Sequence, residues 1–377
     1  MEETIVSVVG DMVRACPGAI SLGQGVVHYP PPPEALEGAR RFLEKPHHKY
    51  SPVPGLPELI EAAKAKLLAE NAVTVGPGRR VMITAGANMG FVNALMAVTD
   101  PGDEVIVPMP YYFNHTRATA MAGCRAVSVP TDASYQLDPA AIRRAVTPKT
   151  RVVVTVSPNN PSGAVYTEAS LREVNLLCRE KGLYHVCDEA YEYFTYGGVR
   201  HFSPASIPGS EPYTISLYSL SKAYGFASWR IGYMVVPAHL FEEVEKVQDV
   251  LVICPPTISQ YAALGALRAG PDYCRRRVRE MEKVRALVLE ELSKIGNICH
   301  VPRTDGAFYF LIGVDTDMDQ MTLVERLIKE YGVGVVPGRC CGLDRKCHLR
   351  VSYGGLAGNS VAEGIGRLVK GLSGLVS

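Results

Sequence analysis

The stretch from residue 216 to residue 233 reads SLYSLSKAYGFASWRIGY and holds a single lysine, Lys222, among serine, small and aromatic residues. Arg230 follows eight positions later. A lysine in such surroundings loses its proton readily, and its neutral amine is then a nucleophile toward carbonyl compounds. Ser219, Ser221 and Arg230 offer hydroxyl groups and a guanidinium to a doubly charged anion. The stretch therefore predicts a site that combines amine chemistry with anion binding.

The same stretch lies in a longer region where short runs of apolar residues recur. We expect about seven strands between residues 80 and 237. Their sequences are VMITAG, EVIVPMP, RAVSVPT, RVVVTVSP, YHVCDEAY, YTISLYSLS and RIGYMVVP. Helical patterns alternate with several of them, one opening at Asn88 and another running from Thr167 to a stop at Gly182. This alternation predicts an α/β fold with a mostly parallel seven-stranded sheet that helices cover on both faces.

Beyond Pro271 the pattern changes to a long charged helix, DYCRRRVREMEKVRALVLEELSKIG, followed by a few strands and helices. A length of 377 residues favours two or three domains. We expect a large cofactor-binding domain at residues 41–272 and a smaller α/β domain at residues 273–377. The N-terminal segment, residues 1–40, is expected to join the small domain.

Composition excludes several classes of protein. The chain has 39 Lys and Arg against 38 Asp and Glu, so no net field directs it toward nucleic acid or an anionic membrane. The opening MEETIVSVVGDMVR lacks the pattern of a secretory leader, and ten scattered cysteines fit reduced thiols in the cytoplasm. Cys340, Cys341, Cys347 and His348 form the tightest thiol group, for which we favour buried or loop thiols over a zinc site.

Polar residues follow several predicted strands, where parallel sheets bind ligands. The run VMITAGANMG turns at Gly86 into a helix, whose first N–H groups suit a phosphate. NNPSG, residues 159–163, has strong turn chemistry. Asp188 ends an apolar run, and a carboxylate there needs a cation or hydrogen-bond donors. Taken singly, each feature also fits a plain turn, a helix cap or a structural ion pair; taken together, they suit a pyridine-aldehyde cofactor.

The whole pattern resembles the fold-type-I pyridoxal-phosphate aminotransferases of classes I and II, over nearly the full length. SLSKAYGFASWRIGY is similar to their lysine signature, NNPSG to their Asn-Pro-x-Gly and DEAY to their Asp-x-x-Tyr. GQGVVHYPPP, ITAGANMGFVN and PYYFN are most similar to a subgroup that includes plant aromatic-amino-acid and methionine aminotransferases. The resemblance implies pyridoxal 5'-phosphate as cofactor and a ping-pong transfer of an amino group between an amino acid and a 2-oxo acid.

The resemblance also implies a role for each matching residue. Lys222 would bond covalently to the cofactor and shuttle the substrate proton, with Asp188 on the pyridine nitrogen and Tyr191 near the ring oxygen. The remaining cofactor contacts would be Ala87, Asn88, Tyr112, Asn160, Ser219 and Arg230. Arg350 would grip the substrate carboxylate as a bidentate fork, assisted by Asn160 and the backbone of Gly25. Tyr50 would reach the phosphate of a neighbouring subunit, which implies a homodimer.

Some features depart from the family pattern. Ser228 stands before Trp229 where glycine is usual, and VVHY replaces an FPDF-like run beside the substrate. His28 is interpreted as a turn residue and His185 as a packed core histidine. No metal is expected.

Val26, Val27 and Tyr29, with Tyr112 and Phe113 from PYYFN, lead us to expect aromatic amino acids or methionine as preferred substrates over aspartate. Arg117 is one cation that a distal carboxylate could use.

The alternatives are an enzyme of the same fold that eliminates instead, such as a C–S β-lyase or an aminocyclopropane-carboxylate-synthase-like enzyme, and a non-catalytic regulator.

Overall fold

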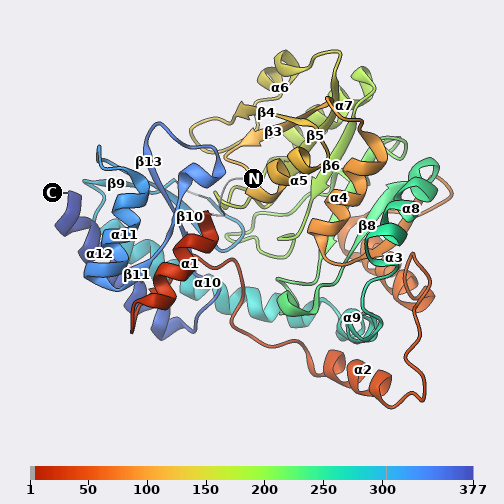
Figure 1. Ribbon diagram of the computed structural model, residues 1–377, viewed down its shortest axis with the longest axis horizontal. Coiled ribbons are helices and arrows are strands. Elements are labelled where there is room, and N and C mark those ends of the chain that lie inside the picture. Colours follow the sequence, from red (N-terminus) through yellow and green to blue (C-terminus); the bar gives the residue numbers. More distant parts are fainter. Residues whose placement is uncertain (1–4, 303, 377) are drawn as a thin grey trace.

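The computed structural model describes residues 5–302 and 304–376 and is built around a seven-stranded sheet (Figure 1). The strand order is β2-β8-β7-β6-β5-β3-β4. The strands are β2 (Arg79–Thr84), β3 (Glu104–Met109), β4 (Arg125–Pro130), β5 (Thr150–Val156), β6 (Tyr184–Asp188), β7 (Thr214–Ser219) and β8 (Gly232–Pro237). Only β8 runs antiparallel to its neighbours, β2 and β7. The predicted α/β class and all seven predicted strands are confirmed.

Helices cover both faces of this sheet. Successive residues of a strand point to opposite faces, so each strand packs against helices on both sides. Val105 and Val107 pack under α4 (Ala87–Val98), α5 (Phe113–Met121) and α8 (Phe241–Val252). Ile106 points the other way, toward α6 (Pro139–Ala145) and α7 (Glu168–Lys181). Farther along that face, Val81 and Ile83 of β2 pack against α3 (Pro57–Asn71) and α9 (Thr257–Ala269). The strands are therefore buried on both sides, as their continuous apolar sequences predict.

Helix α7 shows how the sequence sets the element boundaries. The Thr167 side chain accepts a hydrogen bond from the backbone N–H of Ser170, which caps the first turn. Gly182 ends the helix with a φ of +66°, a conformation that glycine adopts without strain. Both ends lie where the sequence predicts them.

A second part of the molecule contains the remaining sheets. The four-stranded sheet has the order β12-β13-β10-β9, and β1 pairs with β11 in a short parallel sheet. The strands of these two sheets are β1 (Ile20–Ser21), β9 (Cys299–His300), β10 (Tyr309–Val314), β11 (Val333–Gly334), β12 (Val336–Pro337) and β13 (Cys347–Ser352). The helices α1 (Ile5–Ala15), α10 (Pro271–Ser293), α11 (Gln320–Tyr331) and α12 (Gly358–Val376) pack with them. Short 3₁₀ turns are η1 (Pro204–Ser206), η2 (Ala227–Trp229), η3 (Ala238–Leu240) and η4 (Gly338–Cys341).

The N-terminal region contacts both parts of the molecule. Helix α1 packs on α11, and β1 pairs with β11, so the first residues join the smaller sheets. Helix α2 (Pro33–Leu43) packs instead against α9 beside the large sheet (Figure 1). The expected boundaries at residues 40 and 272 thus fall inside α2 and the first turn of α10, and the three-part division stays a prediction. In the described ranges, no helix has the length and apolar character needed to cross a membrane.

Candidate active site

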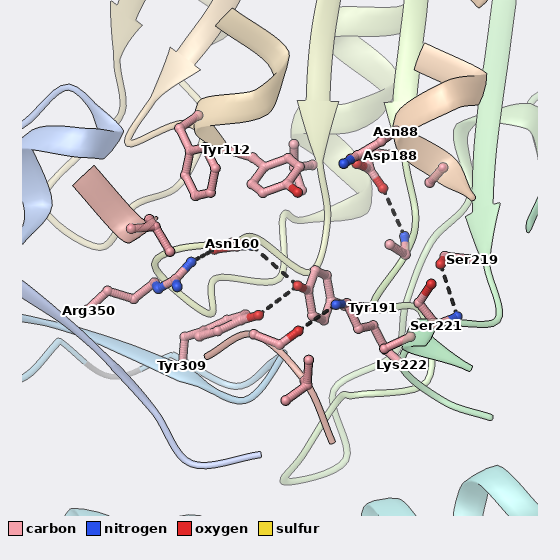
Figure 2. A pocket seen from close by; sticks show the side chains of 18 of the residues that line it. Asn88, Tyr112, Asn160, Asp188, Tyr191, Ser219, Ser221, Lys222, Tyr309 and Arg350 are labelled. Atoms are coloured by element: carbon pink, nitrogen blue, oxygen red, sulfur yellow. Dashed lines mark hydrogen bonds between the residues drawn. The ribbon is translucent and has the colours of Figure 1, made fainter. Parts of the chain in front are cut away.

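A pocket of about 360 Å³ opens at the carboxyl ends of the central strands (Figure 2). Eleven of the predicted site residues line it: Gly25, Ala87, Asn88, Tyr112, Asn160, Asp188, Tyr191, Ser219, Lys222, Arg230 and Arg350. They come from the strand ends of the large sheet, from β13 and from the N-terminal segment. The structure therefore brings together residues that lie far apart in the sequence, although their individual roles stay predictions.

Lys222 lies just after β7, and its amine points into the pocket (Figure 2). Its Nζ donates a hydrogen bond to the carbonyl oxygen of Gly25. Burial lowers the pKa of the Lys222 ammonium to about 8. The charges of Arg230 and Arg350 act in the same direction, whereas that of Asp188 opposes them. The neutral amine is consequently available near neutral pH, as a nucleophilic lysine requires.

Asp188 ends β6 and is almost fully buried at the pocket floor. Its Oδ1 accepts a hydrogen bond from the backbone N–H of Ala190 at 3.1 Å, and its Oδ2 lies 3.1 Å from Nε2 of His115. His115 is buried on α5 against the ring of Phe91. His115 was not among the predicted site residues, although its position three residues after Tyr112, on the same side of a helix, is a usable signal.

A chain of hydrogen bonds joins the two parts of the molecule across the pocket (Figure 2). Nη1 of Arg350 donates to Oδ1 of Asn160 at 2.9 Å, and Nδ2 of Asn160 donates to the Tyr191 hydroxyl at 3.3 Å. That hydroxyl lies 2.7 Å from the hydroxyl of Tyr309. Burial raises the pKa of Tyr191 and brings that of Tyr309 to about 12, so both hydroxyls stay protonated at neutral pH.

Tyr309 is a second pocket residue that was not predicted. It lies on β10, where Leu311 pairs with Arg350 of β13, and the Arg350 guanidinium sits 4.9 Å from its ring centroid. Its position within the apolar run FYFLIG gives no sign of a site. Val6 of α1 also lines the pocket and was not predicted.

One end of the pocket is suited to a phosphate. Gly86, with a φ of +82°, leads into α4, so the free N–H groups at the start of that helix lie beside Asn88. A Cβ on Gly86 would come within 2.7 Å of Nη2 of Arg230. Arg230 is exposed, and its Nη1 donates to the carbonyl oxygen of Ala227 at 2.9 Å. Within the described part of the chain, Arg230 has no acidic partner, which leaves its charge for an anion.

Several predicted contacts lie elsewhere. Tyr50 is 77% exposed and does not line the pocket of its own chain. Val26 lines the pocket, but Tyr29 does not, because its hydroxyl is turned to the carbonyl oxygens of Lys222 and Ala223. Val27 packs against the core. We expected Val26, Val27 and Tyr29 near the substrate side chain, but of VVHY only Val26 lines this pocket.

The histidines behave as expected away from the site. His185 is fully buried between Thr155 and Asn175, and burial lowers its pKa to about 3, so it is a packed core histidine. Nδ1 of His28 lies 3.3 Å from the carbonyl oxygen of Gly354, outside the pocket lining.

The charges in the pocket define what it accepts. Its lining contains three cationic side chains, Lys222, Arg230 and Arg350, but only one carboxylate, that of Asp188. Such an excess of positive charge favours anionic ligands. A lysine with a lowered pKa, a buried carboxylate and an excess of positive charge at the strand ends suit an enzyme that acts on an anionic compound through an amine.

Comparison with known proteins identifies the family. Residues 17–368 match the family described as aminotransferase class I and II, and the chain belongs to it. The protein is therefore a transaminase, and members of this family use pyridoxal phosphate.

Similar proteins include both aromatic and aspartate aminotransferases. An aromatic aminotransferase of Arabidopsis thaliana is 36% identical over 367 residues, which cover 95% of this chain and 90% of the relative. An aspartate/prephenate aminotransferase of Thermus thermophilus is 36% identical over 343 residues, covering 89% and 86%. The solved structure of an aromatic aminotransferase from Pyrococcus horikoshii superposes with a TM-score of 0.90 at 32% identity, covering 97% of this chain and 99% of that chain.

Proposed function

We propose that this transaminase binds pyridoxal 5'-phosphate in the pocket and uses it to exchange an amino group for an oxo group. The observation that carries the proposal is Lys222, a half-buried lysine whose pKa is lowered to about 8. Its pocket is also lined by Arg230 at one end and by Arg350. The donor set fits the cofactor: an aldehyde needs an amine, a pyridine nitrogen needs a carboxylate, and a phosphate needs N–H donors and a cation.

Each group then has one task. Arg230, Ser219 and the first residues of α4, Ala87 and Asn88, would hold the phosphate. Asp188, oriented by the Ala190 N–H and contacted by His115, would keep a proton on the pyridine nitrogen. The bound cofactor supplies a ring that withdraws electrons from the substrate Cα.

The remaining residues would act on the substrate. Lys222 would take the proton from Cα and return it elsewhere, which its lowered pKa favours. Arg350 would bind the carboxylate. Asn160 and Tyr191 would orient the ring oxygen while fixing Arg350 through the chain of hydrogen bonds.

The test is reconstitution of cofactor-free protein with pyridoxal phosphate. We expect a covalent adduct at Lys222, located by reduction with borohydride and peptide mapping, in the wild type but not in Lys222→Ala. With an amino acid and a 2-oxo acid, the loaded protein should form the new amino acid without releasing ammonia or pyruvate. An adduct at another lysine would contradict the proposal.

We further propose that apolar side chains, aromatic or that of methionine, are preferred over the side chain of aspartate. Val6, Val26, Tyr112 and Phe113 line the pocket. Its three cationic side chains are all assigned to the cofactor or to the α-carboxylate, so none of them is left for a distal carboxylate, whose unpaired burial is costly. Arg117 does not line the pocket, and its guanidinium lies 4.9 Å from the Phe113 ring centroid.

The experiment compares kcat/KM for phenylalanine, tyrosine, tryptophan, methionine, aspartate and glutamate with one common oxo acid. Aromatic substrates should lead by about tenfold or more, since a hydrophobic pocket discriminates on that scale. Arg117→Gln should leave the ratio unchanged. A lead for aspartate that Arg117→Gln removes would refute the apolar pocket and identify the missing cation.

We propose a homodimer in which Tyr50 reaches the neighbouring phosphate. The segment that holds Tyr50 is tied to α8 and α9: Nε2 of Gln248 donates to the Val53 carbonyl, and Thr257 Oγ1 to that of Lys49. Beside it, α4, α5 and α8 line an apolar groove with exposed side chains, which suits a second copy of the chain. The side chains are Met96 (53% exposed), Met121 (67%) and Val250 (85%).

Ten free cysteines support a cytoplasmic location.

A further inference from the structure

Two neighbouring thiols lie in the η4 turn, at the edge of the pocket region. Cys340 and Cys341 are successive residues, yet their sulfur atoms are only 3.4 Å apart and in hydrogen-bond contact. In an extended chain, successive side chains point to opposite sides, so the turn itself brings these sulfurs together. The pair has no part in the function proposed above.

The surroundings give the two thiols different chemistry. Cys340 is partly exposed, whereas Cys341 is fully buried. The hydrogen-bond contact with Cys341 lowers the pKa of the Cys340 thiol, burial opposes this shift, and the charges of Arg350 and Arg117 support it. The pKa of Cys341 is raised by its contact with Cys340 and by burial. Because Cys340 is the thiol that solvent reaches, it is the one that a dissolved oxidant meets first, and the Cys341 sulfur lies within reach of it.

The η4 turn is connected to both walls of the pocket. The carbonyl oxygen of Cys341 accepts a hydrogen bond from the backbone N–H of Tyr111, which directly precedes the pocket residues Tyr112 and Phe113. On the other side, β12 leads straight into η4 and pairs with β13 at Arg350. A change in the backbone of this turn would therefore be transmitted to the Tyr111–Phe113 segment and to Arg350.

We propose that Cys340 and Cys341 form an oxidation site at which a peroxide produces a reversible disulfide that weakens carboxylate binding. The second half of this proposal rests on the carboxylate role of Arg350 in the proposed function. The Cys340 thiolate attacks a peroxide oxygen, the O–O bond breaks, and Cys340 becomes a sulfenic acid while water leaves. The Cys341 sulfur then displaces that oxygen as a second water. Both thiols are oxidised, the peroxide is reduced, and two protons are carried away in the water.

Chain geometry explains why the disulfide would be reversible. Adjacent Cα atoms are about 3.8 Å apart, whereas disulfides usually join Cα atoms about 4.4–6.8 Å apart. The ring that joins neighbours is therefore strained, and strained disulfides are reduced more easily than structural ones. Closure also requires η4 to change shape, which supplies the link to Tyr111 and to β12.

The experiment treats reduced, cofactor-loaded protein with a few equivalents of hydrogen peroxide and reads intact mass, peptide map and kinetics. We expect loss of two hydrogen atoms, mapped to Cys340 and Cys341. KM for amino and oxo acids should rise at least about fivefold, the lower end of coupling between two sites. Dithiothreitol should restore both readouts.

Variants make the result specific. Cys340→Ser should neither lose the hydrogens nor change KM with peroxide, and Cys341→Ala should gain oxygen on Cys340 instead. Cys16→Ser, which removes another partly exposed thiol, should respond like wild type. A pair that stays reduced while other thiols oxidise would overturn the site, and a mapped disulfide with unchanged KM would overturn its coupling to the pocket. Because the mass readout needs no activity, failure of the proposed substrate chemistry is distinguishable from failure of the oxidation site.

Discussion

At the scale of single residues, the protonation state of Lys222 controls its reaction with an aldehyde. Its pKa of about 8 means that half of the amine is free near that pH, whereas an ordinary lysine with a pKa of about 10.4 would be almost fully charged. Because the proton must be absent for attack, capture of pyridoxal phosphate by cofactor-free protein should speed up about tenfold per pH unit below about 8 and level off above it. Absorbance of the cofactor measures this rate, and a rise that continues to about pH 10 would contradict the lowered pKa.

Arg350 gives a second prediction, on substrate affinity. Its Nη1 and Nη2 are fixed by Asn160 and by the Gly23 carbonyl oxygen, and its Nε has no partner among the described residues. Arg350→Lys should raise KM about ten- to a hundredfold for amino and oxo acids alike, because a charged hydrogen bond contributes about 1.5–3 kcal/mol.

Two controls accompany the Arg350 test. An amine without a carboxylate should react at the wild-type rate in the variant. Arg117→Lys should also leave KM unchanged, because Arg117 does not line the pocket. An equal loss with the carboxylate-free amine would show that Arg350 only supports the fold.

These residues also show what the sequence could predict at this scale. Lys222 and Asp188 stand out because a charge within an apolar run needs a reason, and their motifs fix their spacing. Tyr309 could not be found, since an aromatic residue in a buried strand looks like core. Of VVHY only Val26 lines the pocket, because the segment after Gly25 is irregular and sequence spacing does not give the direction of its side chains.

At the scale of elements, the strands were predictable because each is a short apolar run bounded by turn residues. The packing of α2 on α9 was not, because it depends on Gly38 and Gly265. A Cβ on Gly38 would come within 2.3 Å of the Tyr261 carbonyl oxygen, and one on Gly265 within 2.1 Å of that of Glu34. The sequence shows that both residues are small enough for close helix contact, but it does not show which helix each of them contacts.

The loop before α4 gives a prediction for an element. Gly86→Ala would place a methyl group against Arg230 and strain a backbone with a φ of +82°. We expect cofactor-free protein to lose about tenfold in affinity for pyridoxal phosphate, in line with about 1–3 kcal/mol of strain. Affinity for pyridoxal, which lacks the phosphate, should change much less. Titration followed by absorbance measures both constants.

The matched control is Gly102→Ala. Gly102 also has a positive φ, +93°, but an added Cβ there would meet no atom within 4 Å. This variant should lower Tm and leave both affinities unchanged. Equal losses for pyridoxal and its phosphate in Gly86→Ala would show a general distortion of the pocket rather than damage to the phosphate cup.

At the scale of the whole molecule, the pocket gathers residues from the large sheet, from β13 and from the N-terminal segment, so the site depends on how these parts are placed. Gly25 follows β1, the partner of β11 in the smaller sheets. Arg350 also belongs to the smaller sheets, while Lys222 and Asp188 lie on the side of the large sheet (Figure 2). A substrate that bridges them would draw the parts together, and we expect closure on binding. If the exposed Tyr50 contacts the phosphate of a neighbouring subunit, each site also depends on a second copy of the chain.

Mixing two variants, each with one substituted site residue, tests whether Tyr50 acts in the site of the neighbouring subunit. Lys222→Ala should be inactive and Tyr50→Ala impaired in cofactor affinity, each as a homodimer. In a hybrid dimer, one site combines an intact Lys222 with the Tyr50 of the neighbouring chain, so it should regain full function. Random exchange of equal amounts places half of the chains in hybrids with one such site, which predicts about a quarter of wild-type activity at low cofactor concentration. Activity no higher than the average of the two separate proteins would show that Tyr50 serves its own chain or neither site.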